Sequence, residues 1–424
     1  MIESVFSYLR DAWNGLQGFL FFLPPFPERI DTLALLSLVL VVGLLVAEWL
    51  RSHWQWPRVL GYVVAGTVFG PPLLGWIKVD ILTQIRPFAD AAHGLLLLEA
   101  GRRLDLRWLA HNRDLLRGTV SDIALSFLAI FLFALLLVGL SPAWAAATAA
   151  VTMASAPAVV LLVVEESRAQ GQVTERVMLY SSLSAAASFV VFIIVLGVVH
   201  AYQSGSWAHS LTHPLWAGGG AYAIGWAVAQ LTLRIAGRLP KRSLAQVFVL
   251  VAMALLAVGI ARMLAVPVFL TLFLMGVLLS LRDEAKTLSY TSLPEGHWML
   301  AIILFVVVGA SLPWREFTWL TGLQAIGLLL VRALAKTLSM ALAGGELPLN
   351  KRLLAGLGIQ PLSATAVFMA FEISRLYPEI GGPALLLAFF AAAIMDIAGP
   401  VLCRFALVRA GETPSEQETG GNGA

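Results

Sequence analysis

Apolar segments separated by short polar loops make up most of this chain. An α-helix needs about 20 predominantly apolar residues to cross the hydrocarbon core of a bilayer. Read to within a few residues, the apolar segments lie at residues 33–50, 58–76, 88–101, 118–140, 142–164, 177–199, 214–233, 245–263, 266–281, 297–312, 319–342, 353–375 and 382–405. The pattern predicts an all-α polytopic membrane protein with about 13 transmembrane helices.

The remaining residues lie at the two ends of the chain. Residues 1–31 combine Arg10 and Asp11 with Phe, Trp and Leu, which predicts an N-terminal amphipathic segment at the membrane surface rather than a further span. Residues 32–408 are expected to form one transmembrane domain. The polar, Gly-rich residues 409–424 predict a disordered tail.

Composition excludes several classes of protein. Hydrophobic residues make up 59% of the sequence and charged residues only 12%, and the mean hydropathy of +0.84 excludes an ordinary soluble domain. The net charge of +3 gives no indication of nucleic-acid binding. The sequence has no Walker-type phosphate loop, no Cys or His spacing suited to a metal and no nucleophile triad, and its seven His lie in loops or near segment ends. We therefore expect no enzyme, no cofactor and no metal site.

Basic residues predict how the chain is threaded through the membrane. Lys and Arg accumulate in cytoplasmic loops, whereas Asp and Glu say little about orientation. Most of the basic residues fall in alternate loops, while the other loops contain Arg29, Lys78, Arg86, Arg262, Arg315 and Arg375. The first span is therefore expected to start outside the cell, and the C-terminus is expected to be cytoplasmic.

Two of the apolar segments are interrupted by proline in the middle. The breaks read MASAPA at residues 153–158 and GIQPLS at residues 358–363. The fifth span enters from outside and the twelfth from inside, so the two broken helices run in opposite directions. Such a pair is typical of inverted-repeat secondary transporters, whose binding site lies at the break near the bilayer midplane. The alternative is that each proline only kinks a packed helix. The predicted transport site contains Ser155, Ala156, Pro157, Gln360, Pro361 and Ser363.

Several stretches resemble the Kef-type family of monovalent cation:proton antiporters. PRVLGYVVAG at residues 57–66 is similar to the family's second-helix signature, and LFVVVGASLPW at residues 304–314 is similar to its Phe-Val-Gly helix. LLLLEAGRRLDL at residues 95–106 and DIAGP at residues 396–400 agree with two more of its helices. The resemblance implies an antiporter fold with two crossed discontinuous helices in a core bundle and a scaffold bundle that dimerises. It also implies a lipid bilayer, a monovalent cation and a proton as partners, and we expect a homodimer in a bacterial inner membrane.

The chain departs from this family at the acidic positions. The family carries one or two acids in the helix after the first break, at positions that correspond to Ser184, Ala185 and Ala186, and residues 177–282 contain no Asp or Glu. A cation and a proton are exchanged when both compete for a buried carboxylate whose pKa is raised by desolvation. Without that acid we expect atypical coupling and a positive potential at the half-helix N-termini that no carboxylate offsets.

Two basic residues, Arg332 and Lys336, lie one helical turn apart in the segment 319–342. Lys336 corresponds to a lysine that faces the core in the family. The alternative is that Lys336 reaches the interface by snorkelling, because it lies only about 9 Å from the helix end. For Arg332 the alternative is a structural pair with an acid on a neighbouring helix.

Any proton coupling has to use Asp396, Glu99 or Asp122. Asp396 is the best candidate because it lies in the middle of its segment without a charged partner in its own helix. The alternative is a capping or packing role beside Gly399 and Pro400.

The other two acids have simpler interpretations. Arg102 and Arg103 follow Glu99 by three and four residues, which favours local ion pairs on one helix. Asp122 lies one turn inside its segment with Arg117 nearby, and we interpret it as an interfacial residue.

Three hypotheses about function follow from these observations. The first is a secondary transporter that exchanges K+ or Na+ for protons with an atypical coupling residue. The second is an anion or organic-acid transporter on the same scaffold, with the cargo held by the helix N-termini, Ser155, Gln360, Lys336 and Arg332. The third is a non-transporting membrane module that keeps the fold.

Overall fold

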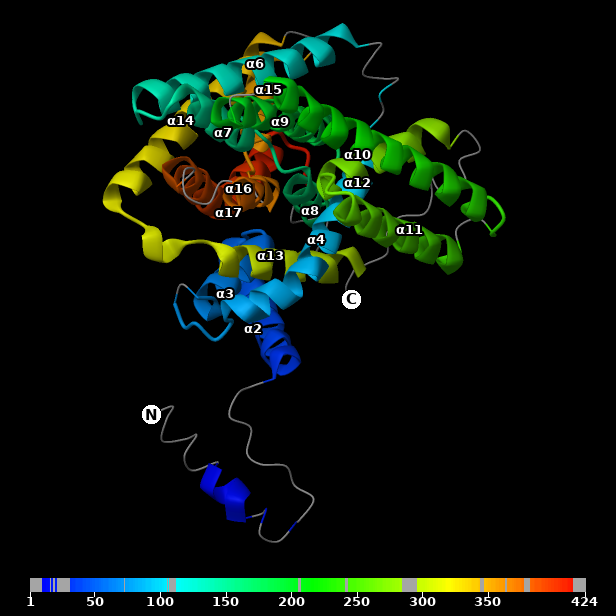
Figure 1. Ribbon diagram of the computed structural model, residues 1–424, viewed down its shortest axis with the longest axis vertical. Helices are drawn as coiled ribbons and strands as arrows, with labels where there is room; N and C mark the ends of the chain where they lie inside the picture. The colour runs from blue at the N-terminus through cyan, green and yellow to red at the C-terminus, as the bar shows by residue number, and fades with distance from the viewer. Residues whose placement is uncertain are drawn as a thin grey trace.

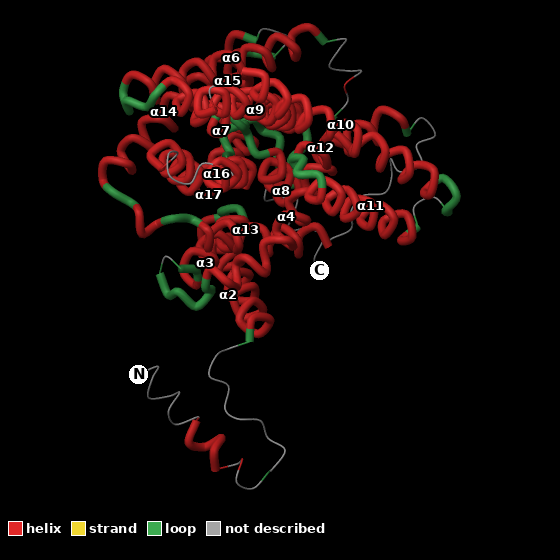
Figure 2. Tube along the Cα trace, in the orientation of Figure 1, coloured by secondary structure: helices red, strands yellow, loops and turns green. Residues whose placement is uncertain are grey.

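The computed structural model describes residues 10–15, 17, 20, 31–71, 73–104, 106, 112–204, 207–240, 243–283, 296–343, 347–362, 364–376 and 382–414. Within these residues the regular structure is helical, without strands (Figure 2). The elements are α2 (Thr32–Trp54), α3 (Val59–Phe69), α4 (Val79–Arg102), α6 (Arg113–Leu136), α7 (Pro142–Thr152), α8 (Pro157–Ser167), α9 (Gln172–Ser204), α10 (Trp207–Ala236), α11 (Leu244–Met263), α12 (Val268–Arg282), α13 (Gly296–Ser311), the 3₁₀ turn η1 (Trp314–Glu316), α14 (Trp319–Leu342), α15 (Leu349–Gly358), α16 (Ala364–Leu376) and α17 (Gly382–Arg409).

Each predicted apolar segment contains one of these helices, except the two segments broken by proline, which each form two. Seven stretches of the described chain are long and apolar enough to cross a membrane: Ala34–Trp54, Arg113–Leu136, Pro142–Ser167, Gln172–Val199, Leu244–Met263, Trp319–Leu342 and Ala384–Arg409. Val59–Phe69 and Val268–Arg282 are shorter apolar helices. The all-α membrane architecture is thus confirmed, and the total of 13 crossings stays a prediction.

The helices form two bundles joined by α10. In the bundle that we call the scaffold, α4 packs on α12 and α13, and α3 packs on α2 and α13. In the bundle that we call the core, α6 packs on α7 and α14, while α17 contacts α7, α14, α15 and α16. Figure 1 shows α2 and α3 at the opposite end of the molecule from α6 and α14. The core bundle contains both broken helices.

Close backbone approach fixes helix packing within the scaffold. A side chain on Gly66 of α3 would overlap the backbone of Val306 in α13, and one on Gly309 of α13 would overlap the backbone of Val63 in α3. Glycine at both positions therefore allows α3 and α13 to touch along their backbones, as small residues do at membrane helix interfaces.

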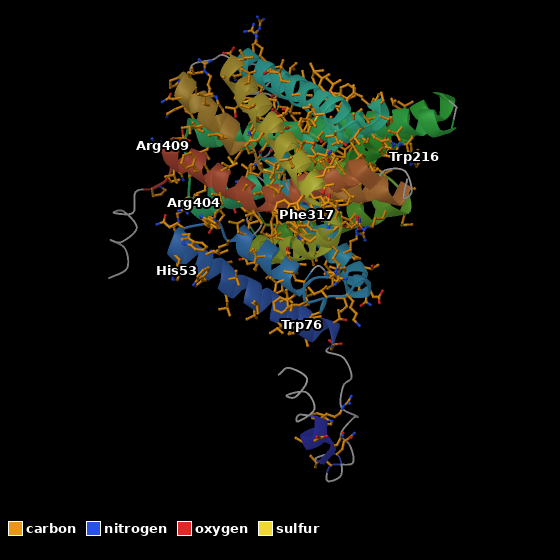
Figure 3. All side chains as sticks on the ribbon, turned by 90° about the vertical axis from the view of Figure 1, so that its left-hand side faces the viewer. His53, Trp76, Trp216, Phe317, Arg404 and Arg409 are labelled. Atoms are coloured by element: carbon orange, nitrogen blue, oxygen red, sulfur yellow. The ribbon has the colours of Figure 1, made fainter. Side chains whose placement is uncertain are left out.

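Six labelled residues that the charge pattern assigns to different sides of the membrane lie apart in Figure 3. In Figure 3, His53, Arg404 and Arg409 lie at the left-hand side, whereas Phe317, Trp76 and Trp216 lie further to the right. The charge pattern assigns the first set to the cytoplasm and the second to the outside. The arrangement agrees with the predicted alternation of loops.

The predicted terminal segments are described only in part. Residues 10–15 are helical, and the rest of the predicted amphipathic segment 1–31 lies almost entirely outside the described residues. In the predicted tail, the carboxylate of Glu412 accepts hydrogen bonds from the backbone N–H groups of Val173 (2.9 Å) and Thr174 (2.8 Å) at the start of α9. The first residues of the tail are therefore held against the core bundle, and residues 415–424 lie outside the described residues.

Candidate functional site

The two broken helices cross at their breaks, as predicted. α7 ends at Thr152 and α8 starts at Pro157, which lacks an N–H donor and holds Ala156 in an extended conformation. The Ser155 hydroxyl donates to the carbonyl of Ile359 (2.7 Å), and the Ala156 N–H donates to the carbonyl of Pro361 (2.8 Å). Backbone groups freed at one break are thus satisfied by the other break. Ser363 lies outside the described residues.

Arg332 of α14 binds the carbonyl ends of both broken helices. Its guanidinium donates to the carbonyls of Thr152 (2.7 Å) and Ala154 (2.6 Å) at the first break. It also donates to the carbonyl and the side-chain oxygen of Gln360 at the second break (2.8 and 2.9 Å). The carbonyl end of a helix carries partial negative charge, which the fully buried guanidinium offsets. The expected alternative, a pair with an acid on a neighbouring helix, is therefore wrong, because the acceptors are backbone and amide oxygens.

Lys336 forms a buried ion pair with Asp122 of α6. Its ammonium group lies 3.0 and 3.2 Å from the two carboxylate oxygens, and the two residues are 0% and 2% exposed. Ser126 also donates to the Asp122 carboxylate (3.1 Å), and Ser339 lies 3.5 Å from it. The interpretation of Asp122 as an interfacial residue is therefore wrong, because its side chain is buried. The alternative that Lys336 snorkels to the interface is excluded, because α6 and α15 pack on α14.

Ser184, one of the positions at which the Kef-type resemblance predicts an acid, faces this ion pair. Ser184 of α9 accepts a hydrogen bond from the Lys336 ammonium group (3.1 Å), and its hydroxyl lies 3.4 Å from the carbonyl of Met153 at the first break. Ala185 is fully buried beside it, and Ala186 is partly buried. The ammonium group of Lys336 therefore connects Asp122 of α6 to Ser184 of α9.

Asp396 of α17 lies close to the second break. It is 1% exposed, and Gly399, one helical turn further along, packs on Pro361 so closely that a Cβ there would stand 2.8 Å from the Pro361 Cα. The glycine thus allows α17 to contact the backbone of the break. The structure thus places Asp396 near the crossing.

Glu99 does not belong to this site. It pairs with Arg102 (3.0 Å) and Arg103 (3.1 Å) at the end of α4, as the spacing predicts. Arg103 also pairs with Glu165 of α8 (2.8 Å). Glu99 is therefore part of a charged contact between the scaffold and the core bundle.

Two cavities approach the crossing. One of about 670 Å³ lies between α4, α8 and α9 and reaches Pro157 and Ser182 from Arg103 at the end of α4 and Arg176 near the start of α9. The other, of about 370 Å³, is lined by residues of α4, α13 and α16 and reaches Phe368. The charge pattern assigns these openings to opposite sides of the membrane.

Sequence reasoning missed one buried ionisable residue. His93 of α4 is 1% exposed and lies 3.2 Å from the Thr365 hydroxyl at the start of α16. The interpretation that every His lies near a segment end or in a loop is therefore wrong. The position of His93 inside the apolar segment 88–101 could have indicated that its side chain is buried.

The described residues contain no group of His, Cys, Asp and Glu that could hold a metal ion. The site instead consists of two crossed broken helices, a buried lysine–carboxylate pair and a buried arginine. Two discontinuous helices that meet at a polar site inside a membrane domain are typical of secondary transporters.

Comparison with known proteins identifies the family. The family model described as "Sodium/hydrogen exchanger, transmembrane" matches residues 36–407, and the chain belongs to this family. A structure of the sodium proton antiporter MjNhaP1 from Methanocaldococcus jannaschii is similar at a TM-score of 0.67 and 18% identity, over 89% of this chain and 98% of that one. An electron-microscopy structure of the same antiporter gives a TM-score of 0.66 and 19% identity, over 90% and 98%. No curated protein sequence matches. These structural likenesses show the antiporter fold.

Proposed function

We propose that this protein exchanges a monovalent cation, K+ or Na+, for protons, and that Asp122 of α6 replaces the acid that its relatives carry on α9. The buried pair of Lys336 and Asp122 beside Ser184 supports the proposal. It supplies a carboxylate next to the crossing although the expected acidic positions are occupied by Ser and Ala.

Charge balance in the buried site supplies the coupling. While Lys336 is protonated, the pair with Asp122 is neutral, and two hydroxyl groups also bind or approach the carboxylate. A cation that binds Asp122 would leave a buried ammonium group without its counter-ion, which costs several kcal/mol. Release of the lysine proton removes that cost. Cation uptake and proton release are therefore linked at one carboxylate.

The anion-transporter hypothesis has less support. It requires free positive charge at the crossing, but Lys336 is bound to Asp122 and Ser184. Arg332 already donates to carbonyl and amide oxygens at both breaks. Two cavities that approach the crossing also favour transport over a purely structural module.

The finer assignments are proposals as well. The motifs quoted above favour a Kef-type member of the family, a homodimer and a bacterial inner membrane. The distribution of basic loops favours a cytoplasmic C-terminus. A cysteine-accessibility map of loops on both faces, made in intact cells, tests the orientation. Cross-linking in membranes tests the dimer.

The exchange itself is tested with purified protein in liposomes that contain a pH-sensitive dye. We expect K+ or Na+ to dissipate a preset pH gradient, while choline, a much larger organic cation, does not. If neither metal cation changes the gradient, the proposal is wrong. Anion-dependent flux that is lost in Lys336→Ala would instead support the anion transporter. The same assay on Asp396→Asn tests the prediction that Asp396 carries the coupling proton, since undiminished flux would exclude it.

Moving the carboxylate back to α9 gives a sharper test. Ser184 lies 3.1 Å from the Lys336 ammonium group, so an aspartate there can replace Asp122 as its partner. We expect the double variant Asp122→Asn/Ser184→Asp to recover cation-dependent flux that Asp122→Asn alone lacks. Ser188→Asp, one turn along α9, is the matched control, because the Ser188 hydroxyl binds the carbonyl of Ala150 instead of Lys336. Equal recovery by both variants would contradict a specific role for position 184.

A further inference from the structure

His93 is a buried ionisable group at the contact between the two bundles. It lies on α4 of the scaffold, and its Nε2 atom shares a hydrogen bond with the Thr365 hydroxyl on α16 of the core (3.2 Å). Its ring packs edge-on against Phe269 (centroids 4.7 Å apart) and beside Phe368 (5.4 Å). The side chain is 1% exposed, and Nδ1 has no hydrogen-bond partner in the described part of the chain.

The imidazole lies between the smaller cavity and the crossing. Phe368, which it contacts, lines that cavity together with Arg86 of α4. Arg86 and His93 are seven residues apart and so lie on the same face of α4, about two turns from each other. Thr365 lies one turn beyond Pro361 on the other side. The ring of Phe368 thus separates His93 from the smaller cavity. One helical turn separates Thr365, the hydrogen-bond partner of His93, from the break at Pro361.

Other charged groups near His93 have their own partners or lie further along their helices. Asp90, one turn before it on α4, is paired with Arg262 of α11. The remaining charged residues on α4 near the cavity and on α12, α16, α8 and α17 are Arg86, Arg282, Glu372, Arg375, Glu165, Glu166, Asp396, Arg404 and Arg409. Among the described side chains, Thr365 is the one that forms a hydrogen bond with the imidazole.

We propose that His93 is a proton-binding residue whose protonation separates α4 from α16 and opens the smaller cavity toward the crossing. A neutral imidazole has one donor and one acceptor, and a single partner at Nε2 leaves one nitrogen unsatisfied. The protonated ring has two donors and a full charge, so its unpaired N–H in an apolar contact is costly. The partial positive charge at the start of α16 adds repulsion. Proton binding therefore favours the arrangement in which water reaches the ring.

The inference rests on the proposed function, because it adds a second proton-binding group to the same transporter. The test of His93 needs no ion gradient. The inference about His93 and the proposed exchange function can therefore fail separately. Val367 lines the smaller cavity and is 1% exposed, and the one natural cysteine, Cys403, is fully buried. A Val367→Cys variant is labelled with a thiol reagent between about pH 8 and about pH 5, the range in which imidazole titrates. Rates are divided by those of Trp319→Cys, which replaces an 88% exposed residue, to correct for thiol ionisation.

We expect the corrected labelling rate to rise several-fold at acid pH when His93 is present and to stay flat in His93→Gln, whose amide can bind Thr365 but cannot titrate. Thr365→Val removes the contact at every pH and should give fast labelling throughout. The inference is overturned by a flat profile with His93 present, by an equal rise in His93→Gln, or by slow labelling at every pH in Thr365→Val. The first of these measurements uses the unaltered histidine and does not depend on the folding of a His93 variant.

Discussion

Replacing Asp122 by asparagine is expected to abolish cation-dependent proton flux and to lower the unfolding temperature markedly. The change leaves the Lys336 ammonium group fully buried with only hydroxyl and amide partners. Breaking a buried ion pair by removing one partner costs about 3–5 kcal/mol. The carboxylate for which a cation and the lysine compete is lost in the same step. Flux is measured in liposomes, and unfolding is followed by intrinsic tryptophan fluorescence.

A second substitution separates the two effects. In Asp122→Asn/Lys336→Gln neither side chain is charged, so most of the lost stability should return, because replacing both partners of a buried pair is often nearly neutral. Flux should stay absent, because no carboxylate is present at this position. Recovery of both properties would show that the pair is structural and would contradict its role in transport.

Asp114→Asn provides a matched control on the same helix. Asp114 pairs with Arg117 at 3.7 Å near the start of α6, and both side chains are more than half exposed. Exposed ion pairs of this kind contribute little to stability. We expect wild-type flux and stability in this variant, so a large loss there would mean that any neutralisation on α6 is damaging.

The architecture could be predicted because its signals are local. Pro157 and Pro361 interrupt apolar segments, and the length of each uninterrupted segment predicts a helix. Glu99 was assigned correctly for the same reason, since its partners Arg102 and Arg103 lie within one turn of the same helix. The length of the apolar segments and the spacing of charged residues within one helical turn were sufficient to predict these features.

The Asp122 pair could not be predicted, because 214 residues separate its two members in sequence. The nearby Arg117 favoured an interfacial interpretation, but five residues turn a helix by about 500°, which places Arg117 roughly 140° away from Asp122. Asp122 also lies nine residues after Arg113, the start of α6, or about 14 Å along the axis. Asp122 is buried because it lies on the face of α6 that packs on α14, and this packing cannot be read from the neighbouring residues in sequence.

The role of Arg332 was missed for a related reason. Charged residues were matched with charged residues, whereas the available acceptors were carbonyl groups created by the breaks themselves. Four acceptor oxygens at the crossing come from Thr152, Ala154 and Gln360. A broken helix always leaves carbonyl groups without donors. This requirement predicts a buried donor near every such break, even where the sequence does not identify the residue.

Replacing Arg332 by glutamine is accordingly expected to have the largest effect on stability of any single change at the crossing. It removes the donor to three buried backbone carbonyls, and an unsatisfied buried group costs about 1–3 kcal/mol. Arg332→Lys keeps the charge but lacks the planar fork that reaches both breaks, so it should recover only part of the loss. Both variants are compared with wild type by unfolding temperature and by retention as a single species in size-exclusion chromatography.

Arg352→Gln is the control that distinguishes the crossing from helix ends in general. Arg352 also donates to two backbone carbonyls, those of Leu347 (2.7 Å) and Ala341 (3.1 Å), but it is only partly buried. Water can replace a donor there, whereas inside the core bundle it cannot do so without separating the broken helices. We therefore expect a small decrease in unfolding temperature for Arg352→Gln and a large one for Arg332→Gln. Equal decreases would mean that the guanidinium at the crossing holds the two breaks together no more strongly than an ordinary helix cap does.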